Sequence, residues 1–185
     1  MKILRLHILC LSLFILSASS CTEKDYEEKL PPETQEGRYT FGCLVNGEIW
    51  LPEGIPLSVP RLSAGMNKEC TYLAIASNQA RDESILILIN NEKIIQGMTI
   101  SLNVNEESFA IYTNTCDIGF FCEYRSTALG QGELTITKLD TTNRIISGRF
   151  SFEATFFDAQ NPDCSCASSF SITEGRFDMK YSLRQ

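Results

Sequence analysis

Residues 144–156 read Arg-Ile-Ile-Ser-Gly-Arg-Phe-Ser-Phe-Glu-Ala-Thr-Phe, and this stretch decides the fold. From Ile146 to Phe156, apolar and mainly polar side chains alternate, and Gly148 stands in one of the apolar positions. Successive side chains of a strand point to opposite faces, so the pattern predicts a long strand with one face in a core. A glycine inside such a strand indicates a β-bulge or a close approach by another group.

The segments on both sides of this strand have the same character. Residues 132–139 precede it across the turn sequence Asp-Thr-Thr-Asn at 140–143, and we expect the two runs to form a hairpin. Downstream, a second alternation predicts a strand at the C-terminus. Its apolar members are Phe177, Met179, Tyr181 and Leu183.

Two further hairpin patterns lie upstream. Residues 40–52 hold two β-rich runs around Asn46-Gly47, a dipeptide that accepts positive φ at both central positions of a type I′ turn. Residues 98–104 and 108–114 are separated by Asn-Glu-Glu, which predicts two neighbouring strands of a meander.

Single strands are expected at residues 71–77 and 85–89. The second reads Ile-Leu-Ile-Leu-Ile, a short apolar run typical of a central strand that is covered on both faces. Residues 61–67 have room for one short helix at most, and no other segment keeps a helical period. The sequence therefore predicts an all-β fold, an antiparallel β-sandwich or partly closed barrel of about 8–10 strands.

The N-terminus has the order of a secretory signal. Lys2 and Arg5 precede a mainly apolar run at 6–16, and small residues lead into Cys21. The run is too short for a membrane-spanning helix, which takes about 20 apolar residues. We therefore expect residues 1–20 to be removed. The ordinary signal peptidase would leave Cys21 as a thiol, whereas lipoprotein processing would leave it lipidated.

The cysteine count favours lipidation of Cys21. An odd number of cysteines follows the signal, which suits an oxidising compartment poorly, and lipidation leaves an even set as disulfide candidates. These candidates are Cys43, Cys70, Cys116, Cys122, Cys164 and Cys166. Their pairing stays open, although a bridge between Cys164 and Cys166 would be strained and one between Cys116 and Cys122 would close a small loop. Structural bridges are favoured over a metal cluster at 164–166.

Residues 21–38 are acidic and polar, with too little apolar content to fold by themselves, and we expect a tether there. Residues 39–185 then form a single domain. Once Lys2 and Arg5 leave with the signal, 14 of the 16 basic residues remain against 23 acidic ones, so the formal charge of −7 becomes −9. This charge argues against nucleic acid as a partner.

The only histidine, His7, lies inside the signal. Its loss excludes Ser-His-Asp and Cys-His nucleophile systems and histidine metal ligation from the mature domain. No cofactor and no metal centre is expected. Asp158, Asn161 and Asp163 do supply oxygen ligands in one loop, but their spacing matches no complete Ca²⁺ motif, so we expect an acidic loop and leave Ca²⁺ binding open.

Two sets of residues are candidates for function. Aromatic side chains could form a platform for stacking sugars, although strand aromatics are usually packed in a core. This aromatic set comprises Trp50, Tyr72, Tyr112 and Tyr124. Paired carboxylates could serve a hydrolase, although no diagnostic motif surrounds them. The carboxylate set comprises Glu133, Asp140, Glu153, Asp158 and Asp178.

Residues 40–47, Thr-Phe-Gly-Cys-Leu-Val-Asn-Gly, together with Trp50, resemble the opening of an uncharacterised Bacteroidetes lipoprotein family. Residues 132–140, 146–152 and 172–178 resemble the paired strands that end many of its members. The acidic start of the tether resembles the export signals of such lipoproteins, but a plain solvated spacer has the same composition. The resemblance implies a fold and an address in the envelope, and no activity.

The sequence thus favours a lipid-anchored, non-enzymatic binding or interaction module of the cell envelope, at the outer membrane, with an undefined ligand. The membrane is its expected partner through the lipid on Cys21. Whether the domain faces the periplasm or the cell surface stays open. The alternatives are a carboxylate-based, glycoside hydrolase-like enzyme and a purely structural envelope protein.

Overall fold

The structure is a computed structural model that describes residues 29–53, 61–78, 83–115, 121–127, 132–157 and 167–184. In these ranges the chain forms twelve strands and no helix, so the all-β prediction is confirmed. The strands are β1 (Thr40–Val45), β2 (Glu48–Trp50), β3 (Leu62–Asn67), β4 (Tyr72–Asn78), β5 (Ser84–Asn90), β6 (Thr99–Leu102), β7 (Phe109–Thr115), β8 (Phe121–Ser126), β9 (Gly132–Asp140), β10 (Ile145–Phe156), β11 (Ser169–Lys180) and β12 (Ser182–Arg184).

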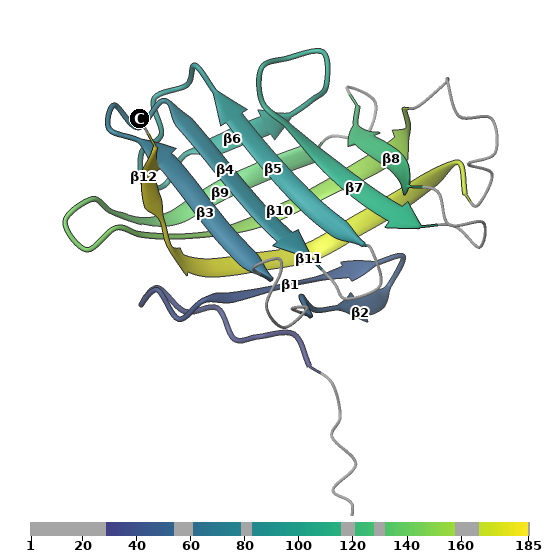
Figure 1. Cartoon of the computed structure of the whole chain (residues 1–185), viewed down its shortest axis with the longest axis horizontal. Coiled ribbons are helices and arrows are strands. Elements are labelled where there is room, and N and C mark those ends of the chain that lie inside the picture. Colours follow the sequence, from purple (N-terminus) through teal and green to yellow (C-terminus); the bar gives the residue numbers. More distant parts are fainter. Residues whose placement is uncertain are drawn as a thin grey trace, which may run out of the picture.

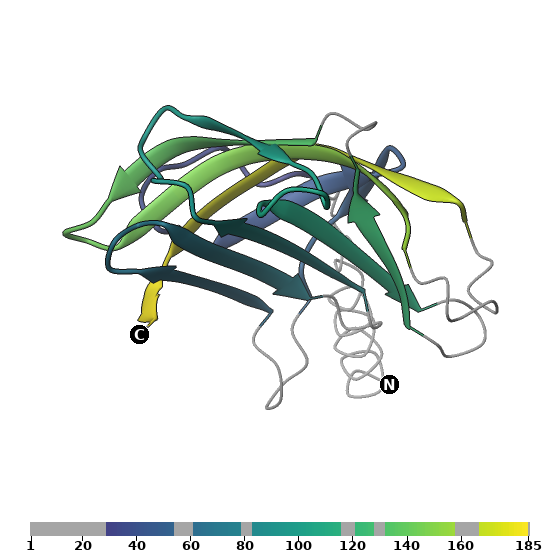
Figure 2. The ribbon, with the colours of Figure 1, turned by 90° about the horizontal axis from the view of Figure 1, so that it is seen from above.

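All twelve strands belong to one mixed, mostly antiparallel sheet that is not closed into a barrel. The main order is β12-β3-β4-β5-β7-β8-β10-β11-β1-β2. One edge of β10 pairs with two strands, with β9 along residues 145–151 and with β8 along residues 154–156. The sheet bends so that β3, β4, β5, β7 and β8, the front layer, face β9, β10, β11 and β1, the back layer (Figures 1 and 2). β12 follows β11 directly and pairs with β3 in parallel.

The core lies between the two layers and is closed by aromatic contacts. The ring of Phe170 on β11 lies 4.8 Å from the ring of Tyr112 on β7 and 4.7 Å from that of Tyr124 on β8, measured between centroids. Each such pair is worth about 0.5–1.5 kcal/mol beyond the area it buries. The three isoleucines of β5 are fully buried beside them.

The predicted hairpins β1–β2 and β9–β10 are confirmed. β1 pairs with β2 across Asn46 and Gly47, whose φ values of 52° and 86° are those of a type I′ turn. β9 pairs with β10, and the Asp140 carboxylate accepts hydrogen bonds from the N–H groups of Thr142 and Asn143 inside the turn.

Gly148 has both properties that its place in the pattern predicted. The register between β10 and β9 shifts between Ser147 and Gly148, which marks a bulge or irregularity. A Cβ at position 148 would lie 2.6 Å from the carbonyl oxygen of Thr135 and 2.7 Å from the Phe177 ring. Any side chain here would therefore collide with backbone as well as with the core.

Three local predictions are wrong. Residues 62–67 form β3 instead of a short helix, because they pair with β4 across a tight turn at Cys70, where φ is 55°. β5 is interior to the sheet as expected, but only one of its faces is covered, and Leu86 and Leu88 on the other face are half-buried. β6 pairs with β9 and not with β7, because Gly132 lets the two backbones approach closely.

The N-terminal boundary of the domain also differs from the prediction. Residues 29–38, which we call the strap, run along the outer face of the back layer and do not belong to a free tether (Figure 1). Pro31 packs so closely on Gly42 that a Cβ there would lie 2.7 Å from the Pro31 ring. The domain therefore begins before residue 39. No helix in the described ranges is long and apolar enough to cross a membrane.

Candidate functional site

The four aromatic candidates do not form a surface platform. Trp50, Tyr112 and Tyr124 lie in the core, with exposed fractions of 4%, 2% and 0%. The Trp50 indole N–H donates to Glu83 at 2.7 Å, and Tyr72 alone lies on an outer face, beneath the guanidinium of Arg184. The stacking platform is therefore wrong, because the strand register turns three of the four rings inward.

Two of the disulfide candidates are free thiols. Cys43 and Cys70 are both buried, and core side chains surround them in place of a second sulfur. Burial raises the pKa of the Cys43 thiol to about 12. Cys122 is fully buried and is not free. The remaining disulfide candidates, Cys116, Cys164 and Cys166, lie outside the described residues. So do Cys21 and the acidic loop with Asp158, Asn161 and Asp163.

Most carboxylates proposed for a hydrolase are engaged in hydrogen bonds. Asp140 accepts the turn hydrogen bonds, and those from Asn143 lower its pKa. Glu153 accepts a hydrogen bond from the Ser171 hydroxyl across the β10–β11 ladder, and Glu133 is exposed on β9. Asp178 differs from all of these, since only 1% of its surface is exposed.

The Asp178 carboxylate on β11 holds the strap to the back layer. It accepts five hydrogen bonds, one from the Ser147 hydroxyl on β10 at 2.8 Å and four from the strap. The strap donors are the hydroxyl of Thr34 at 2.6 Å and the N–H groups of Glu36 at 3.0 Å, Gly37 at 2.7 Å and Arg38 at 3.2 Å. We call this arrangement the latch.

The backbone of the strap is shaped to surround an anion. Gly37 has a φ of 72° and Tyr39 a φ of 58°, so left-handed backbone conformations occur next to the three N–H groups that converge on Asp178. Successive N–H groups in such conformations form a concave anion-binding nest. Gly37 is buried, and a Cβ there would meet the Lys180 side chain at 2.9 Å.

The latch also fixes the charge state of Asp178. Burial raises its pKa, but the hydrogen bonds from Thr34, Glu36, Gly37 and Ser147 outweigh burial and lower the pKa to about 2. A carboxylate offers about four lone-pair sites, and five donors saturate them. Asp178 is therefore an ionised structural acceptor, and it has no capacity left for acid–base chemistry.

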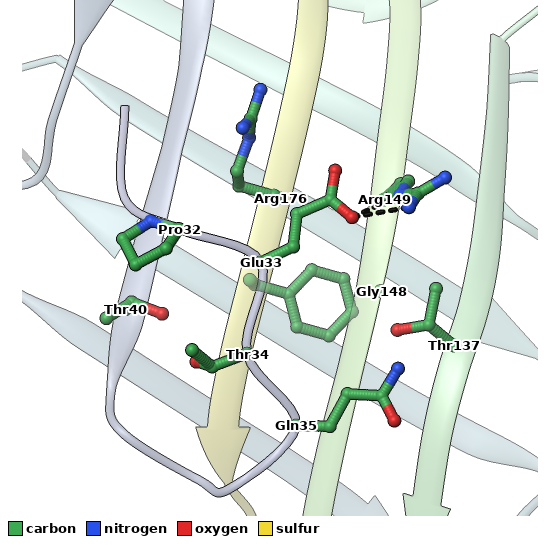
Figure 3. A pocket seen from close by; sticks show the side chains of 10 residues that line it. Pro32, Glu33, Thr34, Gln35, Thr40, Thr137, Gly148, Arg149 and Arg176 are labelled. Carbon is green, nitrogen blue, oxygen red and sulfur yellow. Dashed lines mark hydrogen bonds and ion pairs between the residues drawn. The ribbon is translucent and has the colours of Figure 1, made fainter. Parts of the chain in front are cut away.

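A small cleft lies between the strap and the back layer, beside the latch (Figure 3). Its volume is about 70 Å³, and β1, β11, β10 and β9 contribute to its floor. Arg149 on β10 donates from Nε to the Glu33 carboxylate of the strap at 2.8 Å, and its Nη2 contacts the same oxygen. Arg176 on β11 is the register partner of Arg149 and also lines the cleft.

The outer face of the front layer carries apolar side chains on β5 and β7, next to Arg125 on β8. Leu86 on β5 is the register partner of Ile111 on β7, and Ile111 is the partner of Arg125 on β8. The guanidinium of Arg125 lies 3.7 Å from the centroid of the Phe157 ring, which is 49% exposed. This row, with Leu88 and Phe109 beside it, is called the front face below.

A family model described as a domain of unknown function, DUF6252, matches residues 61–178, more than half of the chain. This chain belongs to the DUF6252 family. No curated protein and no solved structure matches it. The expected membership of an uncharacterised domain family is therefore confirmed.

The DUF6252 match covers the front layer and most of the back layer, and it ends on Asp178. The strap and the β1–β2 hairpin precede the match, so the latch joins a carboxylate of the DUF6252 region to a segment outside it. The sequence names Asp178 only as a candidate hydrolase carboxylate and does not predict its contact with the strap, because it stands in a polar position of an alternating strand, where solvent exposure is the normal expectation. No local signal distinguishes it.

Proposed function

We propose that this chain is a lipid-anchored, non-enzymatic interaction module of the cell envelope that binds its partner through the front face. The observation that supports this proposal is the contrast between the two outer faces of the molecule. The strap of the same chain lies on the back layer, whereas the front face carries partly buried apolar side chains, and the exposed ring of Phe157, in positions that usually hold polar ones.

The composition of the front face suits a binding surface. Leu88 and Phe109 are register partners and continue the apolar row of Leu86 and Ile111. Contiguous apolar side chains rimmed by polar residues mark interaction sites on soluble domains. Arginine and aromatic side chains are enriched among the residues that dominate binding energy, and Arg125 stacked on Phe157 supplies both at one end of the row.

The anchoring part of the proposal is supported by the N-terminal sequence. Residues 1–20 have the order of a signal, Cys21 is its lipidation point, and the acidic run that follows suits an outer-membrane lipoprotein of a Bacteroidetes type. Bridges among Cys116, Cys122, Cys164 and Cys166 would stabilise the exported domain.

A pull-down tests the interaction surface. The chain from residue 22 onward, which keeps the whole strap, is immobilised and exposed to solubilised envelope proteins and glycans. We expect a double substitution of Leu88→Gln and Phe157→Gln to lose the retained partner, and Ile95→Gln to keep it. Ile95 is a matched control because it is 56% exposed and lies outside the front face. Equal retention by both variants would refute the proposed surface.

Mass spectrometry of the N-terminus tests the anchor separately. The expected product begins at Cys21 and carries the mass of its acyl chains, because a single chain anchors only marginally and lipoproteins use several. An unmodified Cys21, or retention of residues 1–20, would contradict the lipid anchor and leave the binding surface untouched.

A further inference from the structure

We propose that the cleft beneath the strap is an oxyanion site, formed by Arg149 and Arg176, which Glu33 of the strap caps from within the same chain. The ligand class is a phosphate group or an oxyanion of similar size. This site lies on the outer face of the back layer and does not depend on the proposed function of the front face.

Two arginines lie side by side on the outer face of the back layer. Arg149 and Arg176 are register partners on β10 and β11 and point to the same outer face. Like charges directly opposite each other on a sheet are unfavourable, so this placement needs an anion to offset it. The chain as a whole is acidic, with a formal charge of −7, which makes a paired cationic site on its surface distinctive.

The positive charge of each arginine is paired with a carboxylate of the same chain. Glu33 contacts Arg149 through one carboxylate oxygen, and the two side chains are 41% and 63% exposed. Arg176 donates from Nε to the Glu174 carbonyl oxygen at 3.1 Å and from Nη2 to the Glu174 carboxylate at 3.2 Å. The Arg176 side chain is 20% exposed and that of Glu174 is 62% exposed. The Arg149–Glu33 pair is exposed on both sides, and exposed ion pairs contribute little to stability, so an external anion can compete with Glu33 for Arg149.

The cleft between these groups has the size and lining of an oxyanion site. Its volume of about 70 Å³ would hold several water-sized groups, which is enough for a phosphate. Thr40 and Thr137 line it from opposite sides, and their hydroxyls are suitable donors to oxyanion oxygens, whereas the Thr34 hydroxyl between them already donates to Asp178 (Figure 3). Glu33 stands at the arginine side, where its carboxylate takes the place of an external anion.

The source of the phosphate group is either a free anion or a lipid headgroup. Glu33 is twelve residues from Cys21, a span of at most about 40 Å when fully extended. A lipid on Cys21 would therefore keep the cleft within reach of headgroups. Both sources present the same chemistry to the arginines, because a guanidinium binds phosphate oxygens through its planar fork.

Titration with inorganic phosphate at constant ionic strength tests the site, using the chain from residue 22 onward. We expect Arg149→Gln and Arg176→Gln each to weaken binding about tenfold, the factor typical of one charge-assisted hydrogen bond. Glu33→Gln is expected to tighten binding about two- to fivefold, because it removes the internal competitor. A gain of affinity is an outcome that misfolding does not produce.

Two matched controls separate the site from general electrostatics. Arg184→Gln removes an arginine on β12, and Glu36→Gln removes a strap carboxylate that pairs with Arg38 outside the cleft. Both variants should bind phosphate as the parent chain does. The proposal is overturned if Arg184→Gln weakens binding as much as Arg149→Gln, or if Glu33→Gln gains no more than Glu36→Gln.

Co-sedimentation with vesicles distinguishes the two sources. Binding to phosphatidylglycerol vesicles that is lost in Arg149→Gln, with no binding to phosphatidylcholine vesicles, assigns the site to headgroups. Binding of inorganic phosphate without such vesicle binding assigns it to a small free oxyanion. If neither probe binds in an Arg149-dependent way, the oxyanion site does not exist.

Discussion

Replacing Asp178 with asparagine removes the charge that the latch is built around, and should destabilise the domain by about 2–3 kcal/mol. The estimate comes from the pKa, which is lowered from 3.8 to about 2. Each pKa unit corresponds to about 1.4 kcal/mol of preference for the ionised form in the folded state. The asparagine amide would add to the loss, because its NH₂ group faces donors where the carboxylate accepted them.

The pH dependence follows from the sign of this shift. The folded-state pKa of Asp178 lies below the unfolded value, so its contribution is fully present above about pH 5 and is lost as the pH falls from about 4 to about 2. We therefore expect the parent chain and Asp178→Asn to differ most near neutral pH and to converge near pH 2. Urea unfolding at a series of pH values, followed by circular dichroism, measures this difference.

A double-mutant cycle with Thr34 measures how much of the free energy of unfolding comes from the hydrogen bond between Thr34 and Asp178. Thr34→Ala removes one hydrogen bond to a charged group and should cost about 1.5–3 kcal/mol in the parent chain. The same change should have little effect in the Asp178→Asn background, because its partner has lost the charge. The reasoning fails if Thr34→Ala costs the same in both backgrounds, or if the effect of Asp178→Asn does not change with pH.

Three further outcomes are expected. Gly148→Ala should destabilise the domain by about 1–3 kcal/mol in urea unfolding through overpacking, since its Cβ would lie 2.7 Å from the Phe177 ring, whereas a midpoint unchanged from the parent would contradict the close packing. Trp50, the only tryptophan, should fluoresce at short wavelength and resist quenching by iodide, because it is 4% exposed. Cys43 and Cys70 should react with a thiol reagent only after denaturation, since both are buried and burial raises the pKa of Cys43 to about 12; labelling of either in the native protein would refute their burial.

The features that the sequence predicted well are those that depend on short-range periodicity. Alternation over residues 145–156 predicted β10 and the bulge at Gly148, and Asn46-Gly47 predicted the first turn, because side-chain direction and positive φ are local properties. The partner of β6 was predicted wrongly because it depends on a contact with Gly132, thirty residues further on. A local sequence pattern does not predict pairing between residues so far apart in the chain.

The candidate site shows the same limit more sharply. The apolar run at residues 85–89 has the same sequence pattern whether one or both faces of the strand are covered. The pattern therefore predicts a second core face where the structure has the front face. Trp50 and Tyr112 are plausible ligand contacts from the sequence alone, because the sequence does not show to which face of a strand an aromatic side chain points. The strap looked unstructured because it is polar, and its order comes from backbone N–H groups, which every residue except proline possesses.

If Cys21 carries the proposed lipid, the latch shortens the distance between that lipid and the domain. If the strap were released, β1 would begin at Thr40, nineteen residues after Cys21, and that length of chain spans at most about 65 Å. With the strap held from Pro31 onward, ten residues separate Cys21 from its first contact in the described part of the chain, a span of at most about 35 Å. Tension on the tether would then reach the back layer through the strap and Asp178 of β11, before it reached β1. Asp178→Asn should therefore release part of the strap and lengthen the tether, in addition to lowering the stability of the fold.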